Sequence, residues 1–317
     1  DGEGTEVGRV MGYLSTREAY GEALAVLGQE REFVVLDADL SKATQTIRFA
    51  KRYPDRFFNM GISEGDMMSA AAGIASTGEC VFASTFAMFA AGRAYEQIRN
   101  SIAYPGLNVK IGATHGGSLI GEDGASHQCI EDISLMRTIP GMTVIVPCDE
   151  YSVFEAVKAA MEIDGPVYLR FGRMSSPPVY AKDTVRFTVG KGNVLRDGND
   201  VVIIAIGDMV YEALAAAQTL SEDGLSAAVI DMASVKPIDR DLILTYAKKT
   251  GKVVTAEDHS VIGGLGSAVA EVLAENGNAK LHRVGVQDRF GCSGKSADLQ
   301  NKFSLNASGI IMAVKDF

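Results

Sequence analysis

Short apolar runs alternate with helical patterns along the whole chain, and this alternation most constrains the fold. Nine runs have the residue types of strands, and in chain order they are Phe33–Leu36, Cys80–Ser84, Val109–Gly112, Thr143–Val146, Val167–Phe171, Val201–Ile206, Ser226–Ile230, Lys252–Ala256 and Leu281–Val286. Strands that are apolar on both faces are typical of parallel sheets covered by helices on both sides. The sequence therefore predicts an α/β protein with open, mostly parallel sheets.

Local signals place two helices and a domain boundary. The S-x-x-E spacing of Ser15 and Glu18 is that of a capping box, which predicts a helix from Ser15 to about Glu30. A second helix is expected from Ser63 to Gly78, and because its body is apolar on nearly every face, we expect it to be buried. The Ser- and Pro-rich segment Met174–Lys191 has no helical periodicity. We therefore predict two domains, residues 1–188 and 189–317.

Composition limits the partners and the location. The 317 residues include 40 acidic and 30 basic side chains, and the net charge of −10 disfavours nucleic acid and anionic membranes as partners. The longest aliphatic stretch, Val201–Ile206, is far shorter than the ~20 residues that span a bilayer, and the N-terminus lacks a secretion-signal pattern. We therefore predict a cytoplasmic protein. The four cysteines lack CxxC spacing, so neither zinc nor disulfides are indicated: Cys80, Cys129, Cys148 and Cys292.

The segment between Ala113 and Gln128 reads ATHGGSLIGEDGASHQ and holds two of the four histidines, His115 and His127. Its four glycines exclude a regular helix. Glycine and short polar residues are also frequent in turns because they favour turn conformations, so an ordinary surface loop is the alternative. The clustering of two histidines with Glu122 and Asp123 favours a site.

Glu64 and a pair of phenylalanines suggest a second part of the same site. Glu64 lies in the first turn of the predicted second helix, where it could serve only the helix dipole or could share a proton with a heterocyclic nitrogen. Phe86 and Phe89 follow a predicted strand, at the carboxyl end where open α/β sheets bind ligands. Core packing is the alternative for both rings. Stacking and hydrogen-bonding groups at one edge could hold a flat ring.

Several ordered motifs together resemble a known family. They are MGISEGDMMSAAAG, STFAMF, THGG followed by GEDGASHQCIEDISLMRTIPGMTVIVPCDE, DGPVYLRFGR, and DHSVIGGLG. The chain resembles the C-terminal half of transketolases and, more closely and over essentially its whole length, the separate C-terminal subunit of split transketolases. The resemblance implies a pyrimidine-binding domain followed by a smaller transketolase C-terminal domain. It also implies thiamine-diphosphate-dependent transfer of a two-carbon ketol unit from a ketose, or ketose phosphate, to an aldose or its phosphate.

The resemblance assigns cofactor-binding roles to four residues. Glu64 matches the glutamate that hydrogen-bonds the aminopyrimidine of thiamine diphosphate and drives it to the imino form. Phe86 matches the aromatic residue that stacks on this pyrimidine, with Phe89 beside it. Asp39, in LDADLS, matches an aspartate near the cofactor. In place of the tyrosine that usually extends the aromatic run, the chain has Gly92.

The resemblance also assigns substrate-binding roles. His115, Asp123 and His127 match groups that hydrogen-bond the hydroxyls and carbonyl of the sugar, and both histidines would assist proton transfers, with His127 near the reacting carbon. His259, in EDHSVIGGLG, is expected to have a structural or interface role rather than a catalytic one.

Two arginines match the residues that clamp the substrate phosphate, Arg17 and Arg173. Arg17 could instead form a surface pair with a neighbouring glutamate. Of Arg170 and Arg173, only one is expected to face a ligand, and the spacing favours Arg173. The serine that commonly assists the clamp is not cleanly matched, although Ser41 or Thr44 could serve.

The diphosphate half of the cofactor site is missing. Thiamine diphosphate enzymes hold the diphosphate through a metal ion at a GDG motif followed by an asparagine, and this chain has no such motif. No metal ligands are therefore expected here, and Mg²⁺ would be bound by an N-terminal partner subunit that carries the diphosphate-binding domain. The resemblance suggests a homodimer within a heterotetramer, which would be inactive without the partner.

Three other functions stay open. A 2-oxo-acid dehydrogenase E1 β-type subunit pairs the same two domains, but it would lack the sugar contacts and would need a lipoyl-domain partner. A deoxyxylulose-phosphate synthase usually has ADG in place of EDG and carries both halves in one chain. From another class, a non-catalytic regulatory subunit would have Glu64 only as a helix-end residue.

Overall fold

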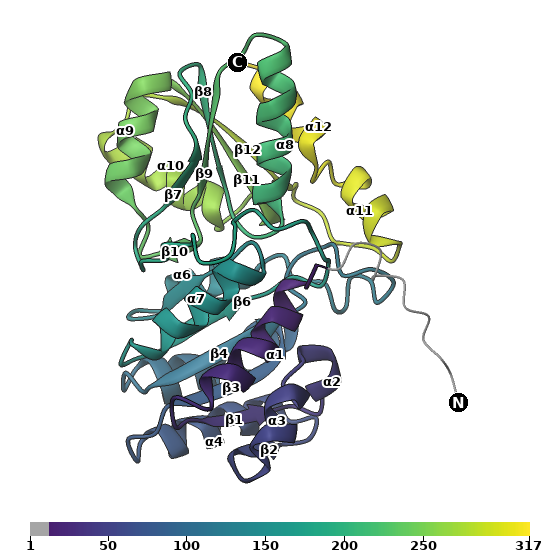
Figure 1. The fold of residues 1–317 in the computed structure, drawn as a ribbon, viewed down its shortest axis with the longest axis vertical. Helices are drawn as coiled ribbons and strands as arrows, with labels where there is room; N and C mark the ends of the chain where they lie inside the picture. Colours follow the sequence, from purple (N-terminus) through teal and green to yellow (C-terminus); the bar gives the residue numbers. More distant parts are fainter. Residues whose placement is uncertain (1–12) are drawn as a thin grey trace.

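The computed structural model describes residues 13–317, which form two mostly parallel α/β sheets, one above the other in Figure 1. The first sheet has the strand order β10-β5-β6-β4-β3-β1-β2, and the second has the order β12-β11-β8-β9-β7. In chain order the strands are β1 (Val34–Asp37), β2 (Phe57–Asn59), β3 (Val81–Phe86), β4 (Val109–Thr114), β5 (Thr143–Ile145), β6 (Val167–Arg170), β7 (Asn193–Arg196), β8 (Val201–Ala205), β9 (Ala227–Asp231), β10 (Ser234–Lys236), β11 (Lys252–Ser260) and β12 (Lys280–Val286). Of these, β7 and β10 pair antiparallel with their neighbours. The predicted fold class is confirmed.

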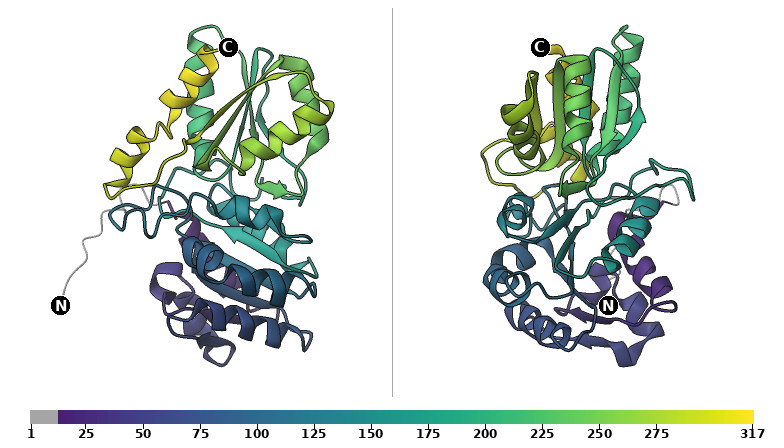
Figure 2. Two further views of the ribbon diagram at one scale, coloured as in Figure 1. Left: turned by 180° about the vertical axis from the view of Figure 1, so that it is seen from behind. Right: turned by 90° about the vertical axis from the view of Figure 1, so that its left-hand side faces the viewer.

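Helices cover both faces of each sheet, as the right-hand view of Figure 2 shows for the first sheet. They are α1 (Thr16–Leu27), α2 (Ser41–Thr44), α3 (Ile47–Arg52), α4 (Glu64–Ala75), α5 (Tyr95–Gln97), α6 (Asp132–Thr138), α7 (Glu150–Met161), α8 (Met209–Glu222), α9 (Arg240–Thr250), α10 (Leu265–Asn276), α11 (Ser296–Lys302) and α12 (Ala307–Lys315), with the 3₁₀ helix η1 (Pro54–Arg56) and the π-helices η2 (Phe89–Arg93) and η3 (Ile98–Ala103). On the first sheet, α1, α3 and α7 cover one face and α4, η2 and η3 the other. On the second, α8 and α12 lie opposite α9 and α10.

All nine predicted strands are present, and β11 runs on beyond its predicted end to Ser260. The sequence analysis missed β2, β7 and β10, which are short and lie at sheet edges. An edge strand pairs on one side only and is buried less completely, so it does not need a continuous apolar run. The strand β10 comes from the second half of the chain but pairs with β5 of the first sheet, which ties the two sheets together.

The two predicted helices are present with shorter bounds. The Glu18 carboxylate accepts hydrogen bonds from the backbone N–H of Ser15 at 2.9 Å and from its hydroxyl at 2.7 Å, and α1 ends at Leu27. The expectation that the second helix is buried on nearly every face was wrong. One side of α4 is exposed at Asp66, Ser69 and Gly73, whose side chains are polar or absent and gain little from burial.

An irregular segment joins the two sheets between β6 and β7, over residues 171–192. It includes the predicted linker, while the exact domain boundary stays a prediction. Residues 1–12 lie outside the described residues. They include the start of the predicted first domain and the N-terminal segment in which no secretion-signal pattern was expected. Within residues 13–317, no helix has the length and apolar character needed to span a bilayer. All four cysteines are free thiols, and Cys129 and Cys148 are buried.

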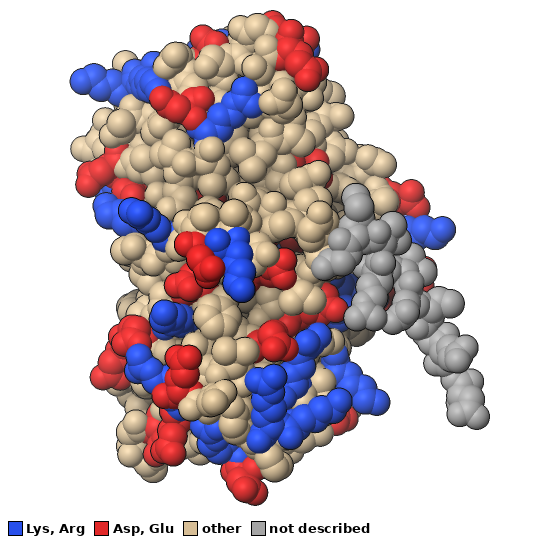
Figure 3. Space-filling view, viewed as in Figure 1, with Lys and Arg blue, Asp and Glu red and all other residues tan. Residues whose placement is uncertain are grey.

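Charged side chains of both signs mix on the face drawn in Figure 3. Basic side chains gather over the part of the lower sheet where α2 and α3 lie. Two of them, Arg48 and Arg52, contact Glu22 at 3.0 and 3.9 Å. Their charge is thus partly neutralised within the chain.

Candidate active site

The carboxyl ends of β3 and β4 bring the predicted aromatic and histidine residues together. Phe86 ends β3 and pairs in register with Thr114, which ends β4. His115 follows directly, and its ring centroid lies 3.9 Å from that of Phe86. Phe89 continues the stack, with its centroid 5.6 Å from that of Phe86 and 21° between the ring planes. Because parallel strands end at the same sheet edge, two motifs that are separate in sequence form one aromatic surface.

Arg93 connects Glu64 to this aromatic surface. Glu64 is the first residue of α4 and is 4% exposed. Its Oε1 accepts a hydrogen bond of 3.1 Å from Arg93. The guanidinium carbon of Arg93 also lies 4.0 Å from the centroid of the Phe89 ring, which is a cation–π distance. The sequence analysis missed Arg93, although its spacing of four residues from Phe89 is the signal that could have indicated a contact.

His115 is held in an unusual backbone conformation. Its φ of +58° is left-handed, which residues other than glycine seldom adopt outside functional sites. Its ring is buried, and Nδ1 lies 3.0 Å from the hydroxyl of Thr114. Burial, together with the charges of Arg17 and Arg173, lowers the pKa of His115 to about 3. His115 is therefore neutral near pH 7 and can act as a hydrogen-bonding group rather than as a cation.

His127, at the far end of the same loop, returns to the aromatic surface. Its ring meets that of Phe89 edge-on, with 5.3 Å between centroids, and lies 6.4 Å from that of Phe86. Its Nδ1 lies 2.9 Å from the hydroxyl of Ser126. His127 is partly exposed where His115 is buried. The structure thus places the two predicted histidines on one aromatic surface.

Two predicted arginines lie close to these histidines. Arg17 donates to the carbonyl of Ala43 at 3.0 Å, while its buried Nε has no hydrogen-bond partner within residues 13–317. Arg173 donates to the carbonyl of Ile120 and lies 3.4 Å from the Asp123 carboxylate. Burial lowers the pKa of Arg17, and the positive charge of Arg173 adds to this effect. An anion bound between the two guanidinium groups would reduce their repulsion.

Arg170 is engaged by the protein itself. Its side chain is 7% exposed, and its Nε donates to the Asp132 carboxylate at 2.8 Å. Its terminal nitrogen donates to the carbonyls of Cys129 at 3.2 Å and Asp258 at 2.9 Å. These partners fix Arg170 beneath the histidine loop. Of the two arginines considered, Arg173 is the one with an exposed guanidinium.

The loop after β1 carries the remaining predicted residues. Asp39 is exposed, has a φ of +63°, and accepts a hydrogen bond of 2.8 Å from Asn59. Thr44 is fully buried and its hydroxyl lies 2.7 Å from the Asp37 carboxylate. The suggestion that Thr44 could bind a phosphate was therefore wrong, because its hydroxyl is inaccessible. Ser41, the alternative, is partly exposed.

The donor set fits one half of thiamine diphosphate. The Glu64 carboxylate and the Phe86 ring offer a hydrogen-bonding group and a stacking face suited to an aminopyrimidine. For the diphosphate, no group of three or more His, Cys, Asp or Glu side chains in the described part of the chain could hold a metal ion.

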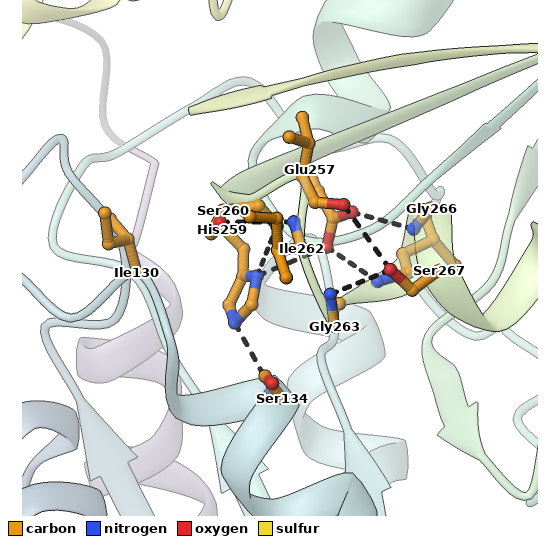
Figure 4. A network of polar contacts seen from close by, with 12 residues as sticks. Ile130, Ser134, Glu257, His259, Ser260, Ile262, Gly263, Gly266 and Ser267 are labelled. Carbon is orange, nitrogen blue, oxygen red and sulfur yellow. Dashed lines mark hydrogen bonds and ion pairs between the residues drawn. The ribbon is translucent and has the colours of Figure 1, made fainter. Parts of the chain in front are cut away.

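His259 lies at the contact between the two sheets, as Figure 4 shows. Its ring is fully buried, and Nε2 accepts from the backbone N–H of Ser134 on α6 at 3.4 Å. Its Nδ1 lies 2.7 Å from the carbonyl of Ser260. These contacts match the interface role expected for His259.

Two protein-family models match the chain. Residues 13–178 match the transketolase pyrimidine-binding domain, and residues 190–310 match the transketolase C-terminal domain. Together the two matches cover most of the chain.

Several relatives match over nearly the whole chain. One, of Methanocaldococcus jannaschii, is assigned as a transketolase C-terminal section and is 51% identical over 307 residues, covering 96% of each chain. Another is the 6-deoxy-6-sulfo-D-fructose transketolase subunit of a Clostridium species, 42% identical over 95% of this chain and 93% of that protein. A 1-deoxy-D-xylulose-5-phosphate synthase of Geobacter sulfurreducens is 37% identical, over 99% of this chain but 50% of its own length.

The chain is also similar to solved structures of transketolases. An inactive β4 tetramer of a split-gene transketolase is similar with a TM-score of 0.88 and 54% identity, covering 96% of this chain and 98% of that one. A transketolase from Leishmania mexicana has a TM-score of 0.81 at 24% identity, covering 96% of this chain and 45% of that one. The second similarity supports the fold.

Proposed function

The chain belongs to the transketolase family, and we propose that it is the C-terminal subunit of a split transketolase. With an N-terminal partner subunit, it transfers a two-carbon ketol unit from a ketose phosphate to an aldose phosphate, with thiamine diphosphate as cofactor. One observation carries the proposal: Glu64, two stacked phenylalanines and two histidines meet at a single sheet edge.

Thiamine diphosphate supplies the carbanion chemistry when it is bound. In the proposed site, Glu64 holds a proton at the aminopyrimidine nitrogen, and the faces of Phe86 and Phe89 orient the ring. Arg93 occupies one oxygen of the Glu64 carboxylate in this structure, and its side chain is 54% exposed. This exposure gives the guanidinium room to move toward solvent and leave the carboxylate to the cofactor. Asp39 is proposed to lie near the cofactor from the loop after β1.

The histidine loop is proposed to bind the sugar. His115, which is neutral near pH 7, orients a sugar oxygen, and Asp123 binds a hydroxyl. The more exposed His127 moves a proton near the reacting carbon, a role that contributes ~10²–10⁴-fold for a well-placed acid or base. Arg17 and Arg173 bind the substrate phosphate. Its negative charge reduces the repulsion between the two guanidinium groups, which favours binding.

A partner subunit completes the site in this proposal. It holds the diphosphate and Mg²⁺, and two copies of this chain join two copies of the partner in the cytoplasm. The match over nearly the whole length of relatives described as a C-terminal section and a transketolase subunit supports the need for a partner subunit. The identity between this chain and half of a deoxyxylulose-phosphate synthase leaves that activity as the runner-up.

Reconstitution tests the proposal directly. We would mix this chain with the product of the adjacent gene, thiamine diphosphate and Mg²⁺, and measure ketol transfer from xylulose 5-phosphate. We expect turnover only when both chains are present, and no turnover with pyruvate as donor. Failure of the mixture both to turn over and to bind the cofactor would overturn the proposal. Turnover with pyruvate would favour the synthase instead.

A further inference from the structure

Three consecutive ionisable residues near the end of β11 have different hydrogen-bond partners. The pairing of β11 with β12 is irregular between Ala256 and Ser260, and such bulges re-aim side chains. Glu257 accepts backbone N–H groups at the start of α10, each at 2.7 Å. The Nδ1 atom of His259 lies 3.8 Å from the Glu257 carboxylate, and its Nε2 atom contacts α6 (Figure 4). Asp258, between them, faces the histidine loop of the first domain.

The Asp258 carboxylate accepts several hydrogen bonds from this loop. Oδ1 accepts from the backbone N–H of Ser118 at 2.8 Å and from its hydroxyl at 2.6 Å. Oδ2 accepts from the backbone N–H of Leu119 at 3.2 Å and lies 3.0 Å from that of Ser118. Asp258 is 6% exposed, so water competes little for these bonds. Charge-assisted bonds of this kind are stronger than neutral ones.

The loop backbone is shaped to admit this carboxylate. Gly117 has a φ of +95°, and a Cβ atom there would lie 2.0 Å from Oδ2 of Asp258. A Cβ atom at Gly116 would lie 2.6 Å from Nε of Arg170, which itself donates to the carbonyl of Asp258. His115, with its left-handed backbone, immediately precedes these two glycines. His115 therefore directly precedes a segment that is in tight contact with Arg170 and Asp258.

The far end of the loop is also attached to the second domain. The Gln128 side chain donates to the carbonyl of Ser118 at 2.7 Å and to that of Cys292 at 2.9 Å. The backbone N–H of Ser260 donates to the carbonyl of Ile130 at 2.7 Å. The second domain thus holds the loop on both sides of the segment that carries Asp123 and His127.

We propose that Asp258 is a positioning residue for the histidine loop, through which the second domain fixes His115 and His127 without contacting the substrate. The glycines that give the loop its shape also give it a large conformational entropy when free. The bonds to Asp258 offset that entropy before any ligand arrives. The positioning rests on the structure alone, while its effect on catalysis rests on the proposed function.

Hydrogen exchange of the full chain tests the positioning. In Asp258→Asn the side chain keeps its size but loses one acceptor oxygen and its charge. We expect peptides covering residues 115–129 to exchange about 10- to 100-fold faster than in the wild type. The matched control is Glu257→Gln, whose carboxylate is equally buried but bonds α10, and it should loosen α10 rather than the loop. Unchanged loop exchange in Asp258→Asn, or equal loosening by Glu257→Gln, would overturn the proposal.

Kinetics of the reconstituted enzyme test the catalytic consequence. We expect Asp258→Asn to lower kcat/KM for the sugar donor about 10- to 100-fold while the Kd for thiamine diphosphate stays unchanged. Ser118→Ala, which removes the hydroxyl bond alone, should have a smaller effect and covers the case in which Asp258→Asn folds poorly. Cofactor affinity falling as much as kcat/KM would contradict positioning. An inactive wild-type mixture would count against the proposed function, and the exchange experiment would still decide the role of Asp258.

Discussion

Both sheets carry polar side chains at the carboxyl ends of their strands, but these side chains are bonded in different ways. At the end of the first sheet, Glu64 and His127 lie against a guanidinium and aromatic rings. At the end of the second, Glu257 and Asp258 accept bonds from backbone N–H groups, and so does His259. A carboxylate bonded to backbone N–H groups is committed to structure, whereas one bonded to an exposed side chain can exchange its partner. The comparison separates the proposed site from the scaffold that holds it.

The same substitution at two glutamates gives the strongest test of this separation. Glu64→Gln in the reconstituted enzyme should lower kcat by ~10²–10⁴-fold, because the amide cannot share a proton with the cofactor. Glu257→Gln should leave the rate at 25 °C near that of the wild type but lower the free energy of unfolding by ~1–3 kcal/mol. Ketol-transfer rates and denaturant unfolding of both variants are the measurements. Undiminished activity of Glu64→Gln would instead favour a regulatory subunit.

Because His115 of the first domain is buried, we expect the free energy of unfolding to decrease in acid. The pKa of this histidine is about 3 in the folded chain, against an ordinary value of 6.5, so the unfolded chain binds the proton more readily between these values. The contribution of His115 to the free energy of unfolding is present above pH 6.5 and is lost as the pH falls below this value. Between pH 6.5 and 4.5 the loss should be about 2–3 kcal/mol.

Unfolding of the wild type and of His115→Asn by denaturant across this pH range isolates the effect, because other titrating groups are common to both. The asparagine variant should lose less stability in acid by that amount. Parallel curves for the two proteins would show that His115 is not held neutral by its surroundings.

The fold was predictable from the sequence because strands buried on both faces are continuous apolar runs. One such strand of the first sheet is β3, which reads VFASTF and is buried at every residue. The edge strand β7 reads NVLR and is only partly buried, so its pattern does not differ from that of a loop. In α4 the sequence did contain a signal that was not used, since the exposed residues Asp66, Ser69 and Gly73 follow each other at three- and four-residue spacing.

The candidate site was predictable where its residues are adjacent to strand ends, as Phe86 and His115 are. Arg93 was missed because an arginine in a helical segment is usually a solvated surface residue. Asp258 was missed because its contact with Ser118 joins positions 140 apart in sequence, and no local pattern records such a contact. Local motifs thus indicate the groups that face a ligand better than the groups that hold them.

A third test concerns the positive charge of Arg173 and its proposed contact with the substrate phosphate. Arg173→Met should raise KM for a phosphorylated ketose about 10- to 100-fold, since a guanidinium–phosphate contact is charge-assisted. The KM for the same ketose without its phosphate should change little, which makes that substrate the control. An equal rise in both KM values would mean that Arg173 acts through Ile120 and Asp123 to shape the loop rather than by binding phosphate.

The smallest effect is expected at Asp231, a carboxylate of the second sheet that bonds to a side chain. It ends β9, is 1% exposed, and accepts from the Tyr180 hydroxyl at 2.7 Å. Burial raises its pKa from 3.8 to about 7. The folded chain therefore binds the proton more tightly, and the stability that this provides at low pH is lost as the pH rises through 7.

Between pH 6 and 8 this loss should be about 1 kcal/mol, and Asp231→Asn should not show it. Denaturant unfolding of the two proteins at pH 6, 7 and 8 measures the difference. Parallel curves for the two proteins over this range would mean that the Asp231 carboxylate is already charged in the folded chain at pH 6. In that case Asp231 would resemble Glu257 and Asp258 in holding a charge at the end of the second sheet, and the contrast with the first sheet would be sharper.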